Sequence, residues 1–394
     1  MTVPGRGPSR PRMTRSTAAR WPGARQVLPE SGEHHGTSGR GAAAESAYHH
    51  VADRLAALIP LLGLQEAHPL IERSYELLCH ESLAFRYGRR PARPSRLNAD
   101  GTPFQFSLTV CGSKPPLQFV ADTCGPLATN AQRISSDRAR IRALSALCGT
   151  DLSLPSIYGL LDEIVPPADP RLLAEGAGAT WLGMSFSPDQ DPRFKIYINI
   201  KWGDPETRWA RLATFSACIG ATACWHEARA ILGDELEPLG VSLVIGPRST
   251  SGRIYLSAYG KPFSYYEVLA GIFAGRAFEQ HLCHFGAAFL QQDYGNPTQS
   301  VVCSLGIQSG QFADFKVELC GHCAFDSDVE AEARCVELLQ QLDMNTAYYL
   351  PVVTLLSQGR LSASRARLHA YLGTGSGGGY PYVTFYFNPA AVIG

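Results

Sequence analysis

The chain has few lysines and no long apolar segment. Only five of its 394 residues are lysines, and its 35 basic residues are balanced by 35 acidic ones, so the formal net charge is zero. This balance argues against a nucleic-acid binder held by overall charge. No apolar run reaches the roughly 20 residues that a membrane-spanning helix needs, and residues 55–64 form only a short one. With 45% hydrophobic residues and no recognisable signal peptide, we expect a soluble, cytoplasmic protein without nucleic-acid or membrane partners.

The eleven cysteines are odd in number and scattered, which is typical of reduced thiols in a cytoplasmic protein. One pair stands out, because Cys320 and Cys323 frame Gly-His between a predicted strand and a predicted helix, as a dithiol redox motif does. The segment 326–332 that follows is acidic, and acidic neighbours disfavour a thiolate. A redox protein therefore stays an alternative. A metal site of these cysteines with His281 or His284 is less favoured, because no second ligand pair has convincing spacing.

The first 44 residues differ in composition from the rest of the chain. They are rich in Gly, Pro, Ser, Ala and Arg and show no hydrophobic periodicity. Such a segment cannot bury enough apolar surface to offset the entropy lost on ordering. We therefore expect a disordered tail at residues 1–44 and a single domain over residues 45–394.

A unit of two strands and a helical segment repeats along this domain, after a helical pattern at 45–84. The predicted strand pairs are 103–110 with 116–122, 179–187 with 193–201, 240–246 with 252–258, 299–307 with 313–320, and 365–373 with 380–388. Helical patterns lie at 128–148, 205–232, 264–285, 328–342 and 348–358. Short turn-rich segments, such as 188–192 and the glycine run 373–379, join the members of a pair. Neighbouring strands should therefore be antiparallel.

Five hairpins separated by helices give ten strands. Helices that return on one side would cover the outer face of the sheet and leave the inner face to line a cavity. Closing the sheet also removes the exposed edges that an open ten-stranded sheet would have to protect. The pattern thus predicts an α+β fold in which a ten-stranded antiparallel β-barrel is surrounded by α-helices.

A cation followed two residues later by an aromatic side chain recurs in the second strand of these pairs. The pairs are Lys195 with Tyr197 and Arg253 with Tyr255, and weaker versions hold Lys316 and the aromatic pair Tyr382 with Tyr386. Residues i and i+2 of a strand point to the same face. A lysine inside an apolar strand is costly unless it meets an anion. The repeats therefore predict an anion-binding, aromatic-lined barrel interior.

This cation–aromatic pattern occurs in several copies at corresponding places in consecutive hairpins. In this the chain resembles the aromatic prenyltransferases of the ABBA-barrel (PT-barrel) type, in particular the dimethylallyltryptophan synthase group. The resemblance covers residues 45–390 and includes Phe-Asn-Pro at 387–389. It implies transfer of a dimethylallyl or geranyl group from an allylic diphosphate to an indole or tryptophan derivative, a phenol or a peptide, in secondary metabolism. No cofactor or metal would be required, and the aspartate-rich motifs of Mg-dependent prenyltransferases are absent from the sequence. The implied diphosphate-binding residues are Lys195, Tyr197, Arg253, Tyr255, Lys316, Tyr382, Tyr386 and, on the second strand, Gln118.

The chain departs from the family pattern at four positions. Gln105 stands where the family has the glutamate that accepts the indole N–H, and Gln118 stands where it has an arginine. Ser251 replaces a frequent arginine, and Glu318 replaces a tyrosine or glutamine. These changes keep prenyl transfer chemically sound but do not imply tryptophan as the acceptor.

The chemistry assigns a role to each group. Cations would stabilise the departing diphosphate, tyrosine hydroxyls would bind its oxygens, and each ring would stabilise an allyl cation by ~0.5–2 kcal/mol. Gln105 can accept a hydrogen bond from the acceptor but cannot take its proton. Asp122 and His369 are candidate bases, although a structural role for His369 is favoured over a catalytic one. A catalytically inactive barrel that binds an aromatic or diphosphate ligand is a further alternative.

Overall fold

The computed structural model describes residues 46–391, except for 93, 112–114, 126–127, 151–153, 166–179, 292–293, 296–300 and 378–379. The tail predicted to be disordered, residues 1–44, lies outside the described residues. Within these ranges, no helix combines the length and apolar character needed to cross a membrane.

The described strands form the predicted closed antiparallel barrel, in which ten strands pair in the order β1-β10-β9-β8-β7-β6-β5-β4-β3-β2. Their bounds are β1 (Phe104–Val110), β2 (Leu117–Ala121), β3 (Thr180–Ser187), β4 (Gln190–Asn199), β5 (Glu237–Ile245), β6 (Thr250–Ser257), β7 (Val301–Gln308), β8 (Gln311–Cys320), β9 (His369–Gly377) and β10 (Tyr380–Phe387). Closure occurs between β1 and β10, where Thr109 lies opposite Thr384 and their hydroxyls hydrogen-bond at 3.1 Å.

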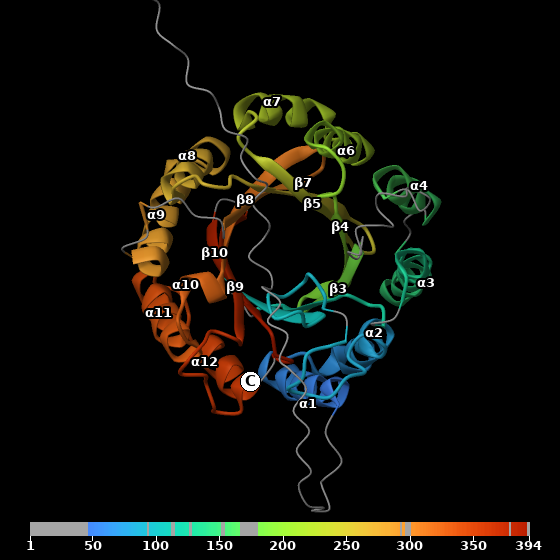
Figure 1. Ribbon diagram of the computed structural model, residues 1–394, viewed down its shortest axis with the longest axis vertical. Coiled ribbons are helices and arrows are strands. Elements are labelled where there is room, and N and C mark those ends of the chain that lie inside the picture. Colours follow the sequence, from blue (N-terminus) through green and yellow to red (C-terminus); the bar gives the residue numbers. More distant parts are fainter. Residues whose placement is uncertain are drawn as a thin grey trace, which may run out of the picture. The chain divides into compact units, whose positions relative to one another are not determined.

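Helices surround the ring of strands (Figure 1). They are α1 (Ala47–Leu61), η1 (Gln65–Ala67), α2 (His68–Cys79), α3 (Asn130–Cys148), α4 (Leu154–Ile164), α6 (Pro205–Cys218), α7 (Thr222–Leu232), α8 (Phe263–Ala274), α9 (Arg276–Leu290), α10 (Gly321–Ala324), α11 (Asp328–Gln341) and α12 (Tyr349–Ser357). Side-chain caps begin several of them: Thr129 forms a capping box with Gln132 at α3, and Asp204 caps α6.

Two long predicted helices are each interrupted once. The segment 205–232 splits into α6 and α7 near Gly220, and the segment 264–285 splits into α8 and α9 at Gly275. Both glycines have positive φ, 72° and 86°, which other residues adopt only with strain. The helical patterns in the sequence also did not predict α4 and the short α10. The glycine run 373–379 was expected to be a turn, but its first five residues belong to β9.

Strand alternation separates an apolar outer face from a polar inner face. On β4, Phe194, Ile196 and Ile198 are at most 1% exposed and form part of the core beneath the helices. Their neighbours Lys195 and Tyr197 point to the opposite face, because successive strand residues alternate. The hydrophobic effect thus stabilises the contact between barrel and helices, and it leaves polar side chains on the inside.

A buried carboxylic acid links α3 to the ends of two strands. Asp137 accepts hydrogen bonds from the hydroxyls of Thr123, just after β2, and Thr180, the first residue of β3. Burial raises the pKa of Asp137 from 3.8 to about 6, although the two threonine hydroxyls partly oppose this shift. The folded state therefore favours the protonated acid.

This raised pKa predicts a pH-dependent loss of stability. Asp137 contributes about 3 kcal/mol to the unfolding free energy below about pH 4. This contribution is lost as the pH rises through about 6. In urea denaturation from pH 4 to pH 7, Asp137→Asn should lack this part of the decline. Asp162→Asn, which removes an exposed aspartate of α4, should retain it. Equal slopes in wild type and Asp137→Asn would contradict the assignment.

Candidate functional site on the inner face of the barrel

Three cations from alternate strands share the inner face. Lys195 lies on β4, Arg253 on β6 and Lys316 on β8. These strands run in the same direction, because each is antiparallel to the strand between them. The positive charges of Lys316 and Arg253 both act on the pKa of Lys195. The structure therefore brings together the cations that the sequence pattern assigns to one site.

Lys195 is held in an environment that weakens its charge. Burial lowers its pKa to about 7, and the neighbouring charges of Lys316 and Arg253 add to the shift. Its ammonium donates to Oε1 of Gln118 on β2 at 2.6 Å. An anion at this position would favour the protonated form again. Binding of an anion would therefore raise the pKa of Lys195 and favour uptake of a proton.

Lys316 belongs to a compact group with a carboxylate and a phenol. Its Nζ lies 2.8 Å from Oε1 of Glu318 and 2.5 Å from the hydroxyl of Tyr386, which in turn donates to Glu318. Burial on its own would raise the pKa of Glu318, but the charge of Lys316 and the two hydrogen bonds outweigh it, so the net shift is downward. Glu318 is therefore an anion in this state of the protein.

Arg253 is paired in a similar way. Its guanidinium forms an ion pair with Asp314 of β8 and donates to Oγ of Ser304 at 2.9 Å. The hydroxyl of Tyr382 donates to Oδ2 of the same aspartate at 2.8 Å. Burial on its own would lower the pKa of Arg253, but the charge of Asp314 reverses this effect, so the guanidinium stays protonated.

Asp314 is the member of the site that the sequence pattern did not identify. It stands two residues before Lys316, as Glu318 stands two residues after it, so all three share the inner face of β8. Charged residues at every second position, with the apolar Phe315 and Val317 between them, were the signal in the sequence that could have identified Asp314. Three cations and two carboxylates give the group a formal charge of +1. We call these five residues, Lys195, Arg253, Lys316, Asp314 and Glu318, the cation cluster.

Tyrosines surround the cation cluster, and glycines make room for them. The rings of Tyr197 and Tyr255 lie 6.2 Å apart, and the hydroxyl of Tyr255 is 3.2 Å from Oγ of Ser242. On β9, a Cβ at Gly375 would lie 2.4 Å from the hydroxyl of Tyr382. A Cβ at Gly373 would lie 2.7 Å from Cε of Lys316. Gly373 and Gly375 therefore provide space for inner-face side chains.

Gln105 has its amide oriented by the segment that precedes β1. Its Nε2 donates to Oδ1 of Asn98 at 2.6 Å and to the carbonyl oxygen of Leu97 at 3.3 Å. The side chain is 4% exposed. Because both bonds use the nitrogen, Oε1 is the atom through which this amide can accept a hydrogen bond.

The hypothesis that Asp122 is a base needs correction. Its carboxylate lies 2.6 Å from the guanidinium of Arg133 on α3, and both side chains are less than 10% exposed. Ser95 also donates to it at 2.9 Å. These buried contacts occupy both carboxylate oxygens with partners from other segments of the chain. Asp122 therefore links the end of β2 to α3.

The hypothesis that His369 is a base also needs correction. The register between β9 and β10 shifts between Tyr386 and Phe387, which places His369 opposite Phe387 on the outer face. Its Nδ1 is 3.1 Å from Oδ1 of Asp328 on α11, and its Nε2 is 2.9 Å from the hydroxyl of Tyr349 on α12. The structural role that the sequence left open for His369 is the one observed.

The two cysteines of the possible redox motif lie close together, at the end of β8 and in α10. A hydrogen bond from Cys320 and the nearby His322 lower the pKa of the Cys323 thiol to about 5. In the acidic segment that follows, Asp328 binds His369 and Glu330 pairs with Arg334. His281 instead lies near Thr374, with Nε2 2.7 Å from its hydroxyl.

Comparison with known proteins places the fold but gives no match by sequence. No protein-family model and no curated protein sequence matches this chain. Among solved structures, 5-dimethylallyltryptophan synthase from Streptomyces coelicolor superposes with a TM-score of 0.77 at 19% identity, over 89% of this chain and 100% of the other.

Two further structures contain ligands. The prenyltransferase PriB, in a ternary complex with L-tryptophan and dimethylallyl thiolodiphosphate, has a TM-score of 0.76 at 20% identity, over 89% of this chain and 98% of its own. The 6-dimethylallyltryptophan synthase from Micromonospora olivasterospora, in complex with the thiolodiphosphate and tryptophan, has a TM-score of 0.74 at 20% identity, over 88% of this chain and 98% of its own. This chain thus has the fold of these prenyltransferases.

Proposed function

We propose that the protein is an aromatic prenyltransferase that moves a dimethylallyl or geranyl group from an allylic diphosphate to an aromatic small molecule or peptide. The observation that carries this proposal is the placement of Lys195, Arg253 and Lys316 on one inner face. A diphosphate needs several positive charges and hydrogen-bond donors at once. The ligands of the structural neighbours support the same class of donor.

The proposed reaction begins when the carbon–oxygen bond of the donor breaks and its electron pair leaves with the diphosphate. The three cations stabilise that leaving group, and the hydroxyls of Tyr382 and Tyr386 bind its oxygens. To do so, they exchange their present bonds to Asp314 and Glu318 for bonds to phosphate. The rings of Tyr197 and Tyr255 stabilise the allyl cation, and the closed barrel limits access of water to it.

The acceptor is held from the side of Gln105. Its aromatic carbon or heteroatom attacks the allyl cation, a new bond forms, and the acceptor then loses a proton. An amide cannot take that proton. We assign this role to Glu318, whose carboxylate loses its partner when Lys316 turns to the diphosphate. An acceptor other than free tryptophan fits this arrangement, since the position of Gln105 offers no carboxylate to an indole N–H.

The two carboxylates of the cation cluster should oppose donor binding. Asp314→Asn removes a negative charge from beside Arg253, which then is free to bind phosphate. We expect inorganic diphosphate to bind this variant about tenfold more tightly or better, since a repulsion of that size follows from like charges several ångströms apart. Calorimetric titration measures the change. Asp191→Asn, at an exposed position on β4, serves as the control, and unchanged affinity in Asp314→Asn would contradict the role given to Asp314.

The function is tested by incubating the protein with dimethylallyl or geranyl diphosphate, EDTA and a panel of indoles, phenols and short peptides, with mass spectrometric detection. Mass gain of one prenyl unit on an acceptor is the expected result and identifies the acceptor class. Donor binding without turnover on any acceptor would favour the inactive barrel. Absence of both binding and turnover would overturn the proposal.

A further inference from the structure

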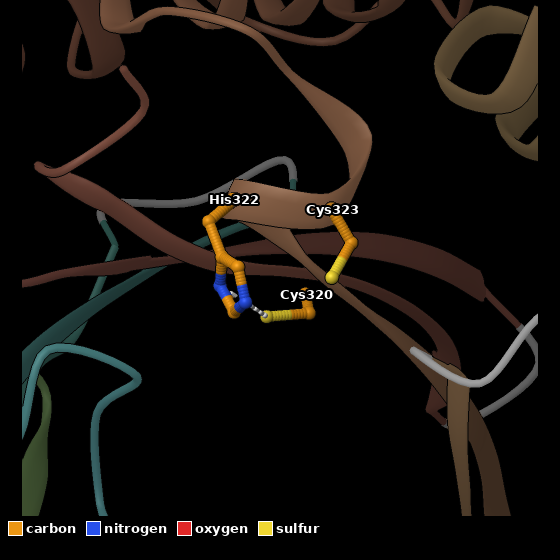
Figure 2. A group of neighbouring side chains, drawn as sticks. All are labelled: Cys320, His322 and Cys323. Atoms are coloured by element: carbon orange, nitrogen blue, oxygen red, sulfur yellow. Dashed lines mark hydrogen bonds between the residues drawn. The ribbon is translucent and has the colours of Figure 1, made fainter. Parts of the chain in front are cut away.

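A second group of chemically reactive side chains lies at the end of β8. Among the described residues, Cys320, His322 and Cys323 form a set in which the two thiol sulfur atoms and one ring nitrogen lie within 4.8 Å of one another. Figure 2 shows the imidazole and the two sulfur atoms converging on one point. The prenyl-transfer mechanism uses none of the three.

The backbone is shaped to bring these side chains together. Cys320 ends β8, and α10 starts at the next residue and carries the other two. The connecting residue is Gly321, where a Cβ would lie 2.0 Å from the carbonyl oxygen of His369. Only glycine permits the chain to turn into α10 so close to β9. The short spacing of the motif and this turn place all three side chains around one point.

We propose that Cys320, His322 and Cys323 bind a single zinc ion. Two thiolates and one imidazole are a ligand set that zinc prefers, and bond lengths of about 2.0–2.3 Å in a tetrahedron separate such ligands by roughly 3.5–3.8 Å. Nε2 of His322 lies 3.7 Å from Sγ of Cys320, which matches this separation. Nδ1 lies at 2.8 Å and makes a hydrogen bond that the ion would replace.

The surroundings decide what type of zinc site this is. Cys320 is 4% exposed, whereas His322 and Cys323 are exposed, so an ion can enter from solvent. No fourth cysteine, histidine or acidic side chain of the described residues joins the group. Three protein ligands with a fourth position open to solvent are the arrangement of a zinc ion that can still bind another molecule. The bound ion would also fasten α10 to the end of β8.

Metal binding is measured directly on the full-length chain. The protein is reduced, stripped with a chelator, and titrated with Zn²⁺ in competition with a chromophoric chelator. One equivalent should bind tightly, and Co²⁺ in place of zinc should give thiolate-to-cobalt charge-transfer absorption. The melting temperature should also rise when zinc is added.

Two ligand variants and one control make the test specific. Cys323→Ser and His322→Ala change exposed side chains, so both should fold, as thermal unfolding will show, and both should bind zinc about 100-fold more weakly or worse. Cys218→Ser removes an exposed thiol at the end of α6 and should bind as the wild type does. Equal zinc affinity in Cys323→Ser and wild type would overturn the proposal. So would a Cys320–Cys323 disulfide in the isolated protein whose reduction leads to no metal uptake, which would favour the redox alternative.

Discussion

Replacing Lys195 by methionine is expected to weaken the binding of dimethylallyl diphosphate by about 100-fold while the barrel stays folded. Methionine keeps much of the length and apolar stem of lysine but removes the charge-assisted hydrogen bond to phosphate, and the loss of such a bond inside a protein has this magnitude. Gln118, the present partner of Lys195, is neutral and loses only one hydrogen bond. Calorimetric titration of the donor measures the affinity.

The pH dependence of donor binding gives a second result for the same variant. Because the pKa of Lys195 is lowered to about 7, its charged form declines as pH rises above 7. Wild-type affinity should therefore fall by up to about tenfold per pH unit in this range. Lys195→Met should lack this component, while ionisation of the diphosphate itself affects both proteins equally.

Lys261→Met provides the matched control, because Lys261 lies in the connection between β6 and α8 and pairs with Glu235 at 2.6 Å. This variant should bind the donor as the wild type does. Unchanged donor affinity in Lys195→Met, or an equal loss in the two variants, would remove Lys195 from the diphosphate site.

Replacing Arg253 by methionine should destabilise the folded protein by about 3 kcal/mol. The side chains of Arg253 and Asp314 are only 21% and 12% exposed, so the substitution leaves a largely buried carboxylate without its cationic partner. Breaking one side of such a pair costs about 3–5 kcal/mol, and the hydrogen bond from Tyr382 offsets part of this cost. Urea denaturation at pH 7 measures the loss of unfolding free energy.

The double variant Arg253→Met/Asp314→Asn separates a buried-charge effect from a packing effect. It removes the unpaired carboxylate, so most of the lost stability should return. If the double variant is as unstable as Arg253→Met, or if the single variant is as stable as the wild type, the ion pair does not have the structural role assigned to it.

The barrel could be predicted from the sequence because its signals are local and repeated. Each hairpin carries its own alternation, as in the run from Phe194 to Tyr197, and five such pairs in sequence leave few other ways to satisfy the strand edges. The helix interruptions at Gly220 and Gly275 were missed, because apolar spacing continues across them and the positive φ of a glycine is not visible in a periodic pattern. The bounds of β9 were wrong for a related reason, since glycines usually indicate a turn, whereas Gly373 and Gly375 lie within the strand and provide space for side chains.

The cation cluster could be predicted only in part. Lys195, Arg253 and Lys316 have the same signal, a cation inside an apolar strand, and the structure places them together. Asp314 was overlooked because a carboxylate near a turn usually contacts solvent. His369 was assigned to the inner face by simple alternation, which the register shift beside Phe387 reverses. Ion pairs such as Asp122 with Arg133 depend on contacts between separate elements, and periodicity does not reveal them.

The most direct test of the central claim is a crystal structure of the protein with dimethylallyl thiolodiphosphate, an analogue that resists cleavage. We expect its diphosphate to contact Lys195, Arg253 and Lys316, with Asp314 and Glu318 displaced from at least one of these cations and the prenyl chain against Tyr197 and Tyr255. An analogue bound outside the barrel, or a cation cluster whose ion pairs persist at saturating analogue, would contradict the claim that this cluster is the site of an allylic diphosphate.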